Sequence, residues 1–226
     1  MGEALLHADA LPSTLFLLES GELRQLVNHP SEPDRSLTLA LHTPGFIAGW
    51  ASLQAGQPLE FLTAASECTV LAIPTSDWLQ LLQQHPSLAL SAQQQLSPAD
   101  LWPLLQQQPN LPLPTGSKEL RPWMRRLSQE AHCVVIPAGQ PSQESLDPAC
   151  RWLVATSGQP LPYGSELLPE QLPTLQGQLQ QPLRLIGLPQ SLWLQTPLAA
   201  APALAQPTAA APLRPAAAIP AEEVAS

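Results

Sequence analysis

One 13-residue pattern occurs twice in this 226-residue sequence, with five residues identical between the two segments. The segment CTVLAIPTSDWLQ at residues 68–80 aligns without a gap with LRLIGLPQSLWLQ at residues 183–195. In both segments a proline follows an apolar run, and the sequence Ser-x-Trp-Leu-Gln comes shortly after the proline. An apolar run that ends at proline predicts a strand, and the residues that follow predict the start of a helix. The chain is therefore expected to hold two similar strand-proline-helix segments.

A second pair of matching segments lies upstream of the first. LFLLESGEL at residues 15–23 aligns with WLVATSGQP at residues 152–160, and both place Ser-Gly after an apolar run. Glycine adopts the positive φ that a tight turn requires, so each segment predicts a strand, a turn and a strand. The offset between the copies is 137 residues at Ser-Gly but 115 at the proline, which makes the second copy 22 residues shorter in its middle. We predict two β-rich units, the second lacking about one hairpin.

Apolar patterning also predicts the elements of the first unit. Ser76 or Thr75 is expected to cap a helix that runs through Gln84, and the Ser97-Pro98 pair to begin another. The Pro- and Gln-rich residues 106–117 are typical of a linker. The strands predicted for this unit are residues 14–18, 23–27, 37–42, 61–64 and 70–73.

Three segments in register resemble the cyclic nucleotide-binding family. They are LFLLESGELRQLV, PGFIAGWASLQAGQP and LTAASECTVLAIPTSDWLQLLQQHPSLA, which lie between residues 11 and 89. The resemblance implies a mainly β chain with flanking helices, made of two tandem jelly-roll units of which the second is shortened. The expected division is a first unit at 1–105, a linker at 106–117, a second unit at 118–196 and a disordered Ala/Pro-rich tail at 197–226.

The resemblance also locates a ligand-binding cassette, in which a Glu binds the ribose and an Arg neutralises the cyclic phosphate. Trp50 stands where the Glu is expected, and Pro58 or Leu59 stands where the Arg is expected. No Lys or Arg occurs anywhere from residue 36 to residue 117. The cassette is therefore expected to have lost cyclic-nucleotide binding, with Trp50 either plugging the empty pocket or lying on a surface turn. The candidate ligand-binding residues of this degenerate cassette are Gly45, Gly49, Trp50, Ser52, Leu53, Pro58 and Leu59.

The segment GWASL at residues 49–53 resembles a particular branch of the family. It is similar to the tandem degenerate domains that precede the peptidase and transport parts of cyanobacterial type I secretion exporters of the ABC class. The chain has no GxxxxGK[ST] loop and no Cys/His peptidase constellation. The resemblance therefore implies a protein partner, namely an ABC exporter or its substrate.

Composition excludes several other classes of protein. A formal net charge of −9 disfavours nucleic acid, because binding it depends on Lys and Arg that neutralise phosphates. Three widely spaced cysteines and five scattered histidines indicate neither a disulfide framework nor a metal site, and no cofactor is expected. Ser20 and Ser157 lack the GxSxG pattern, so we name no catalytic residue and expect no enzyme.

The leading hypothesis is a non-catalytic regulatory or docking module. Neither a signal peptide nor a run of about 20 apolar residues occurs, which predicts a cytoplasmic protein, held at the inner face of a membrane only through a partner. The short start, MGEALLHADALP, predicts an exposed sheet edge that favours pairing with another chain. The alternatives are a sensor for a small ligand or cyclic nucleotide, and a truncated product without activity. One basic cluster, Arg121, Arg125 and Arg126, could meet an acidic partner or be a solvated helix face.

Overall fold

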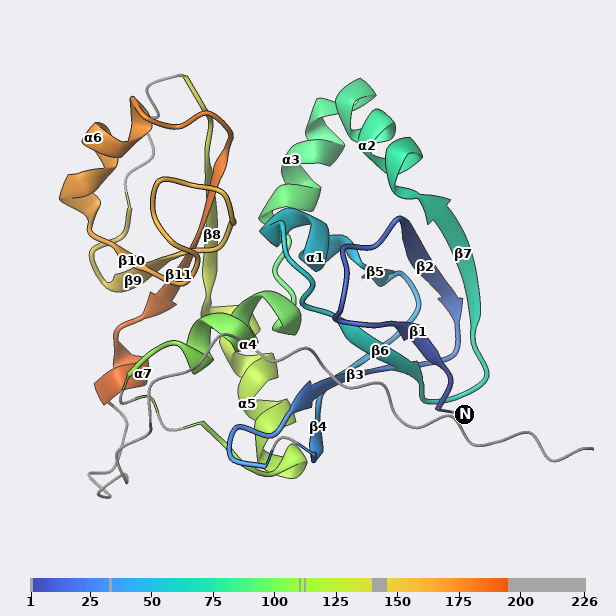
Figure 1. Ribbon diagram of the computed structural model, residues 1–226. Helices are drawn as coiled ribbons and strands as arrows, with labels where there is room; N and C mark the ends of the chain where they lie inside the picture. The colour runs from blue at the N-terminus through green and yellow to red at the C-terminus, as the bar shows by residue number, and fades with distance from the viewer. Residues whose placement is uncertain (1, 33, 110, 112, 140–145, 195–226) are drawn as a thin grey trace, which may run out of the picture.

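A computed structural model describes residues 2–32, 34–109, 111, 113–139 and 146–194 (Figure 1). The chain first forms a compact β-rich region, then a set of helices, and then a second β-rich region that lies beside the first. The strands of the first region are β1 (Ala4–Leu6), β2 (Thr14–Ser20), β3 (Leu23–Asn28), β4 (Ser36–His42), β5 (Ile47–Ala48), β6 (Phe61–Ala64) and β7 (Thr69–Pro74).

Helices connect the two regions and surround them. The helices up to the second region are α1 (Trp50–Ala55), α2 (Thr75–Gln84), α3 (Pro86–Gln94), α4 (Pro98–Gln106) and α5 (Ser117–Glu130). The elements that follow are β8 (His132–Ile136), β9 (Cys150–Val154), β10 (Glu166–Leu167), η1 (Pro169–Gln171), α6 (Leu172–Gln176), β11 (Leu183–Pro189) and α7 (Ser191–Leu194).

Two antiparallel sheets build the first region. One has the strand order β1-β6-β3-β4 and the other has the order β5-β2-β7. The alternation in β3 explains its position, since Leu23, Gln25 and Val27 point inward while Arg24 is exposed. Leu18 and Leu62, from different sheets, meet in one apolar cluster, so the two sheets pack face to face. All five strands predicted for this unit are present within two residues at each end.

The structure adds elements that the sequence patterns did not predict. Residues 4–6 form β1, which pairs antiparallel with β6 and covers that edge. In the other sheet β7 is an end strand, and its Leu71 side chain is 49% exposed. The prediction of a Ser76 or Thr75 cap is wrong: Pro74 is the residue before α2, no side chain caps the helix, and the Thr75 hydroxyl donates to the Pro12 carbonyl. Helix α4 begins at Pro98, as predicted.

The second region is a single four-stranded sheet of order β10-β9-β11-β8. A second jelly roll is therefore not confirmed, since a jelly roll has two sheets. The pairing of its central strands still parallels that in the first region. In the first region Leu15 of β2 pairs with Ile73 of β7. The residues aligned with them in the second region are Trp152 and Leu188. Trp152 pairs with Gly187, which is one residue away from Leu188.

The largest core cluster joins the two regions. It contains Leu37 of β4, Leu101 of α4, Leu120 of α5, Leu153 of β9 and Ile186 of β11, all buried. The predicted linker takes part in this packing. Within residues 106–117, Leu111 and Leu113 pack against the cluster, and the buried Gln108 donates its side-chain amide to the Gly164 carbonyl at 3.4 Å. Helices α4 and α5 are thus a shared wall rather than a free connection.

Two further predictions concern the ends and the surroundings of the chain. The predicted Ala/Pro-rich tail at 197–226 lies outside the described residues. Within the described ranges, every helix is too short or too polar to cross a membrane.

Candidate functional site

The degenerate cassette is built around a tight connection between β5 and α1. Gly49 joins the two elements with a φ of 93°, a left-handed conformation that glycine adopts without strain. A Cβ at this position would lie 2.8 Å from Cδ2 of Leu15, so the close approach also requires glycine. The turn directs the backbone N–H groups at the start of α1 toward the chain that precedes β6.

The side chain of Glu60 occupies these N–H groups. One carboxyl oxygen accepts the Gly49 N–H at 3.0 Å, and the other accepts the Ser52 N–H and the Ser52 hydroxyl, each at 3.1 Å. The Ser52 hydroxyl oxygen in turn accepts the Leu59 N–H at 3.1 Å. Glu60 is 2% exposed, and its burial, together with the nearby charge of Asp100, raises its pKa to about 7. The first turn of α1 is thus satisfied from within the protein.

Trp50 lies beside this arrangement and is buried. Its indole N–H donates to the Ala92 carbonyl of α3 at 2.9 Å, and the Gln54 side chain donates to the same oxygen. The ring meets Trp78 of α2 edge to face, with ring centroids 5.8 Å apart. The interpretation of Trp50 as a surface aromatic is therefore wrong, because the indole fills the space between α1 and the helices above it. Trp78 is a core residue, as predicted.

A small pocket adjoins Trp50 and Glu60. Its volume is about 20 Å³, which is room for a single water molecule. Pockets that hold drug-sized ligands measure about 300–1,000 Å³. The lining residues are Phe46, Ile47, Trp50, Ala51, Gln54, Glu60, Gln95, Ser97 and Asp100.

Trp50 is the one predicted cassette residue that lines this pocket. Gly45 forms a left-handed turn before β5, and a Cβ there would meet no atom within 4 Å. Leu53 packs against the core cluster of Trp50 and Trp78. Pro58 and Leu59 lie in the loop before β6, and Gly49 and Ser52 bind Glu60. Among the predicted residues, the Leu53 N–H donates to the Gly49 carbonyl and the Leu59 N–H to the Ser52 hydroxyl.

Polar and aromatic groups also fill the space behind the pocket. His42 of β4 stacks on Phe46, with ring centroids 3.6 Å apart, and its Nε2 lies 2.8 Å from the side-chain oxygen of the fully buried Gln25. Burial lowers the pKa of His42 to about 4, which keeps the ring neutral. His42 is thus a half-buried residue at the end of β4 that packs on Phe46.

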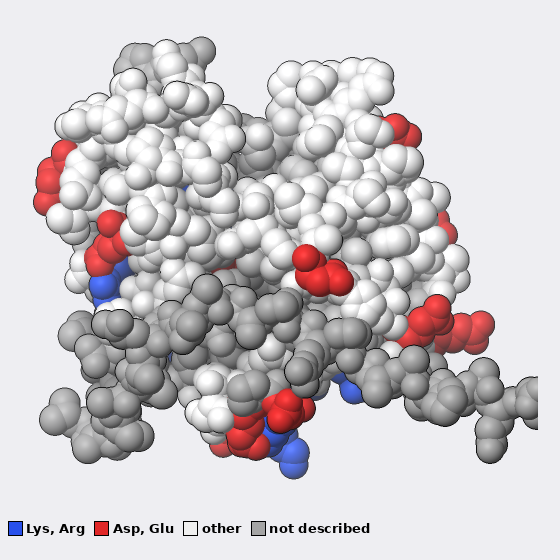
Figure 2. All heavy atoms as spheres, viewed as in Figure 1, with Lys and Arg blue, Asp and Glu red and all other residues white. Residues whose placement is uncertain are grey.

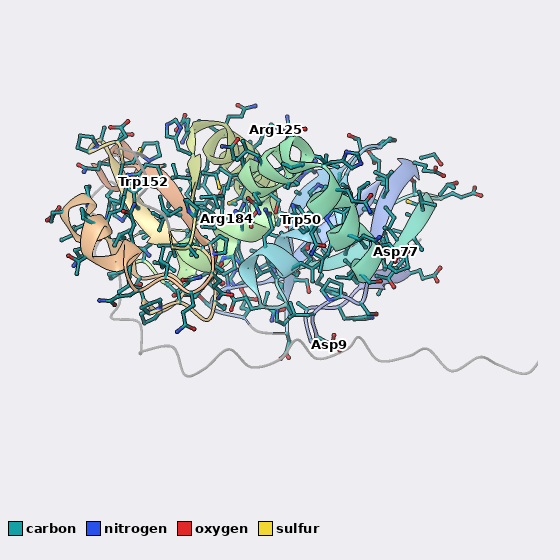
Figure 3. All side chains as sticks on the ribbon, turned by 90° about the horizontal axis from the view of Figure 1, so that it is seen from above. Asp9, Trp50, Asp77, Arg125, Trp152 and Arg184 are labelled. Atoms are coloured by element: carbon teal, nitrogen blue, oxygen red, sulfur yellow. The ribbon has the colours of Figure 1, made fainter. Side chains whose placement is uncertain are left out.

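Sequence reasoning missed Glu60, Asp100 and Arg184, and Arg184 comes from the greatest distance along the chain. It comes from β11 of the second region, is 3% exposed, and binds the Asp100 carboxylate at 2.6 Å. The same guanidinium donates to the Gln93 carbonyl at 3.1 Å and to the Gln95 carbonyl at 2.7 Å. Figure 3 shows Arg184 and Trp50 near the middle of the molecule, where the regions meet. A cation therefore does reach the surroundings of the pocket, but Asp100 neutralises it.

No metal site emerges from the described part of the chain. Among those residues, no three His, Cys, Asp or Glu side chains gather in a way that could hold an ion. The two acids nearest the pocket are both engaged: Glu60 accepts three hydrogen bonds, and Asp100 binds Arg184 and accepts the Ser97 N–H at 2.8 Å. The arrangement holds elements together and leaves no polar atom of Glu60 or Asp100 unpaired.

The match to a known family covers the first region. Residues 1–85 match the model of the cyclic nucleotide-binding domain family. The match confirms the predicted fold of this part of the chain, a fold whose domains are as a rule regulatory. No curated protein matches the chain.

Several solved structures are similar to parts of the chain. The Catabolite Activator Protein of Thermus thermophilus is 29% identical over 41% of this chain and 44% of its own, with a TM-score of 0.36. A transcriptional regulator of Thermotoga maritima is 24% identical over 40% of this chain and 70% of its own, with a TM-score of 0.36. A cyclic nucleotide-binding domain of Methylobacillus flagellatus is 24% identical over 38% and 48%, with a TM-score of 0.34. The chain thus spans less than half the length of the Thermus protein.

Proposed function

We propose that this chain is a non-catalytic regulatory or docking module that keeps a cyclic nucleotide-binding fold and has lost its nucleotide site. The position of Glu60 carries the proposal. Its carboxyl group accepts the N–H groups of Gly49 and Ser52, within the cassette where the resemblance places a ligand. Both protonation states of Glu60 offer an acceptor oxygen there, so a phosphate would have to displace the side chain.

Space and charge support the same conclusion. The pocket beside Trp50 has room for about one water molecule, far less than a nucleotide needs. Arg184 is the nearby cation, and it is bound to Asp100 and to two backbone carbonyls. Burying a phosphate without a free countercharge costs several kcal/mol. A bound cyclic nucleotide would therefore be both crowded and unpaired.

We infer further that the chain consists of two related units, the second a shortened form of the first. The aligned segments at 68–80 and 183–195 support this inference. The antiparallel pairing of β2 with β7 and of β9 with β11, which agrees within one residue after alignment, supports it independently. The 22 residues that the second copy lacks fall in the interval that holds α1 and Glu60 in the first.

The proposed partner is a protein, specifically an ABC exporter of the type I secretion class or its substrate. The support is the resemblance of residues 49–53 to the degenerate domains of such exporters. Cross-linking of the full chain in cells that express an exporter with a peptidase domain tests this assignment. Cross-links to exporter or substrate are expected, and their absence with both would remove the assignment while leaving the docking function open.

Calorimetric titration of the full chain with cyclic AMP and cyclic GMP tests the loss of the nucleotide site. We expect no binding up to about 1 mM ligand, and binding at about micromolar affinity would overturn the proposal. The matched variant is Glu60→Ala, which frees the N–H groups of Gly49 and Ser52. A gain of weak phosphate binding by Glu60→Ala, with an unchanged circular dichroism spectrum, would support the role assigned to Glu60.

A second candidate function is a sensor for a small uncharged ligand. The family match of residues 1–85 favours it, as do the side-chain amides of Gln54 and Gln95 beside Trp50 in the pocket. Tryptophan fluorescence, compared between the native chain and Trp50→Phe, separates the two functions. A saturable change with a neutral ligand that is lost in Trp50→Phe would establish the sensor, and no change is expected for a docking module.

A further inference from the structure

Helix α5 carries the densest group of basic side chains in an acidic protein. Lys118, Arg121, Arg125 and Arg126 are four of the nine Lys and Arg residues in a chain whose Asp and Glu number 18. The helix is held in place from its opposite side. Its apolar residues at 120, 124 and 127 are buried in the core cluster that joins the two regions.

Most cations outside this helix are paired with a carboxylate. Four pairs account for half of the eight Lys and Arg residues in the described ranges. They are Arg35 with Glu32, Arg126 with Glu130, Arg151 with Glu166, and Arg184 with Asp100. Among the described residues, the cations without a carboxylate within 4.0 Å are Arg24, Lys118, Arg121 and Arg125.

Three of these four unpaired cations share one face of α5. The spacings of three and four residues between Lys118, Arg121 and Arg125 place their side chains in a row. The row is about 10 Å long at the rise of an α-helix. Lys118 and Arg125 are exposed and Arg121 is half-buried. Figure 3 shows Arg125 at the outer rim of the molecule, on the side opposite Asp9.

The surroundings make this row distinctive. Figure 2 shows a different face of the molecule from the one that carries Arg125, and most of that face carries neither sign of charge. On α5 itself, Glu130 pairs with Arg126, which lies on the neighbouring side of the helix. The exposed Glu119 follows Lys118 on the same helix but forms no ion pair with these cations. Among the described residues, the three cations in one row are therefore a concentration of positive charge without a paired carboxylate.

We propose that Lys118, Arg121 and Arg125 form a docking strip for an acidic segment of a protein partner. The proposal deepens the docking function proposed above and rests on it. Guanidinium groups match carboxylates with two parallel hydrogen bonds, and two arginines one turn apart present two such sites to a row of Asp or Glu. A partner segment of a few residues meets the strip alone, because charges farther than about 8 Å are largely screened at physiological salt.

A membrane surface fits this strip less well than a peptide does. Lipid-binding segments that depend on charge usually gather about four to eight Lys and Arg residues, and the strip has three. A flat anionic surface would also meet the negative charge of the rest of the chain, whose net charge is −9. Trp123, the aromatic residue on α5, packs against the core and is not free to insert into lipid.

Fluorescence anisotropy of the full chain with a labelled octaglutamate peptide tests the strip at low salt. We expect binding that weakens when NaCl is raised, and at least about tenfold weaker binding by the Arg121→Gln/Arg125→Gln double variant, since each lost charge-assisted pair contributes a factor of that order. The matched control is Arg24→Gln/Arg35→Gln, which removes the same charge elsewhere and is expected to change affinity less than about twofold. If the first double variant does not fold, Lys118→Gln/Arg125→Gln replaces it, because both of those residues are exposed.

Several outcomes would overturn the proposal. The first is that the peptide does not bind at low salt, and the second is that both double variants weaken binding equally. The third is that the chain binds vesicles of anionic phospholipid through Arg121 and Arg125 but does not bind the peptide. Retention of affinity by Arg121→Lys/Arg125→Lys would support attraction by charge. Binding of cyclic AMP would overturn the loss of the nucleotide site and leave the peptide measurement unaffected, so the two failures are distinguishable.

Discussion

The strand-proline-helix segments of the two regions share a sequence pattern and have opposite surroundings. β7 is the end strand of its sheet and pairs with β2 alone, whereas β11 lies between β9 and β8. Leu71 in β7 is 49% exposed, and the aligned Ile186 in β11 is fully buried. The pattern thus specifies a strand that ends at proline, and the neighbouring elements decide whether that strand is covered.

Two of the differences between the segments fit this change of surroundings. β11 has Gly187 where β7 has Ala72, and a Cβ on Gly187 would lie 2.8 Å from the Trp152 ring. The second residue of β11 is the buried Arg184, and the aligned residue in β7 is the exposed Thr69. The central strand β11 thus has a glycine under a tryptophan and a buried cation at positions where the end strand β7 has Ala72 and the exposed Thr69.

The largest expected effect comes from removing that buried cation. Arg184→Ala leaves Asp100 buried without its partner, which costs about 3–5 kcal/mol of unfolding free energy. The matched control is Thr69→Ala at the aligned, exposed position, with an expected change below about 0.5 kcal/mol. Urea denaturation measures both, and a cost below about 1 kcal/mol for Arg184→Ala would mean that the ion pair does not hold the regions together.

The aligned apolar residues provide the next contrast. Ile186→Ala is expected to lower the free energy of unfolding by about 2–5 kcal/mol, because it leaves a cavity in the core cluster. Leu71→Ala is expected to change it by less than about 0.5 kcal/mol, because much of that side chain already meets water. Equal costs in urea denaturation would show that β7 is covered in solution, for example by another copy of the chain.

A pH dependence is expected from the first region, because Glu60 is buried just before β6. Its pKa is about 7 in the folded state against 4.5 when unfolded, so the folded state binds more protons between these values. Stability from Glu60 is therefore full below about pH 4.5 and is lost as the pH rises through 7, by up to about 3 kcal/mol.

Urea denaturation of the native chain and of Glu60→Gln, at several pH values from 4.5 to 8, measures this loss. Burial lowers the pKa of His42 to about 4, so that ring reduces the stability of both proteins as the pH falls below 6.5. The difference between the two proteins isolates Glu60. A difference that does not change with pH would contradict the assignment.

The smallest effect on stability is expected at Gly187. Gly187→Ala should cost about 1–3 kcal/mol, because the new methyl group forces the Trp152 ring to move. The reverse change at the aligned position, Ala72→Gly, should cost about 0.5–1 kcal/mol through backbone entropy alone. Thermal unfolding compares the two, and an equal cost would show that Trp152 moves aside easily.

Local patterning predicted the first region well. Strands β2, β3, β4, β6 and β7 have alternating or continuous apolar residues bounded by Pro, Gly or Asn, which are strong signals. Three of the elements that were missed are too short to show a period: β1 has three residues, β5 has two and α1 has six. The nine-residue α3 was also missed, because Pro86 predicts the end of the preceding helix, whereas in the structure it begins another. The cap of α2 was misplaced because the Thr75 hydroxyl has a distant partner, the Pro12 carbonyl.

The candidate site was only partly readable. Trp50 could be singled out because it stands where the family pattern has an acid. One of the two interpretations of that change, a plug in the pocket, implies a buried indole, and Trp50 is buried. Glu60 gave a weaker signal, a lone acid in the apolar segment PLEFL at residues 58–62, which a search for buried carboxylates would have raised. Arg184 gave none, because it meets Asp100 across 84 residues of sequence and no local rule links them. Contacts of that separation arise only once the regions pack.

The core cluster that runs through α4 and α5 makes the two regions mechanically one piece. A fragment that ends at residue 105 would expose the buried Leu101 and Leu104, and a fragment that begins at 118 would expose Leu120 and Met124. We therefore expect neither fragment to fold stably on its own. A partner that grips the outer face of α5 therefore holds both regions at once, and any strain it applies is passed to the two sheets together.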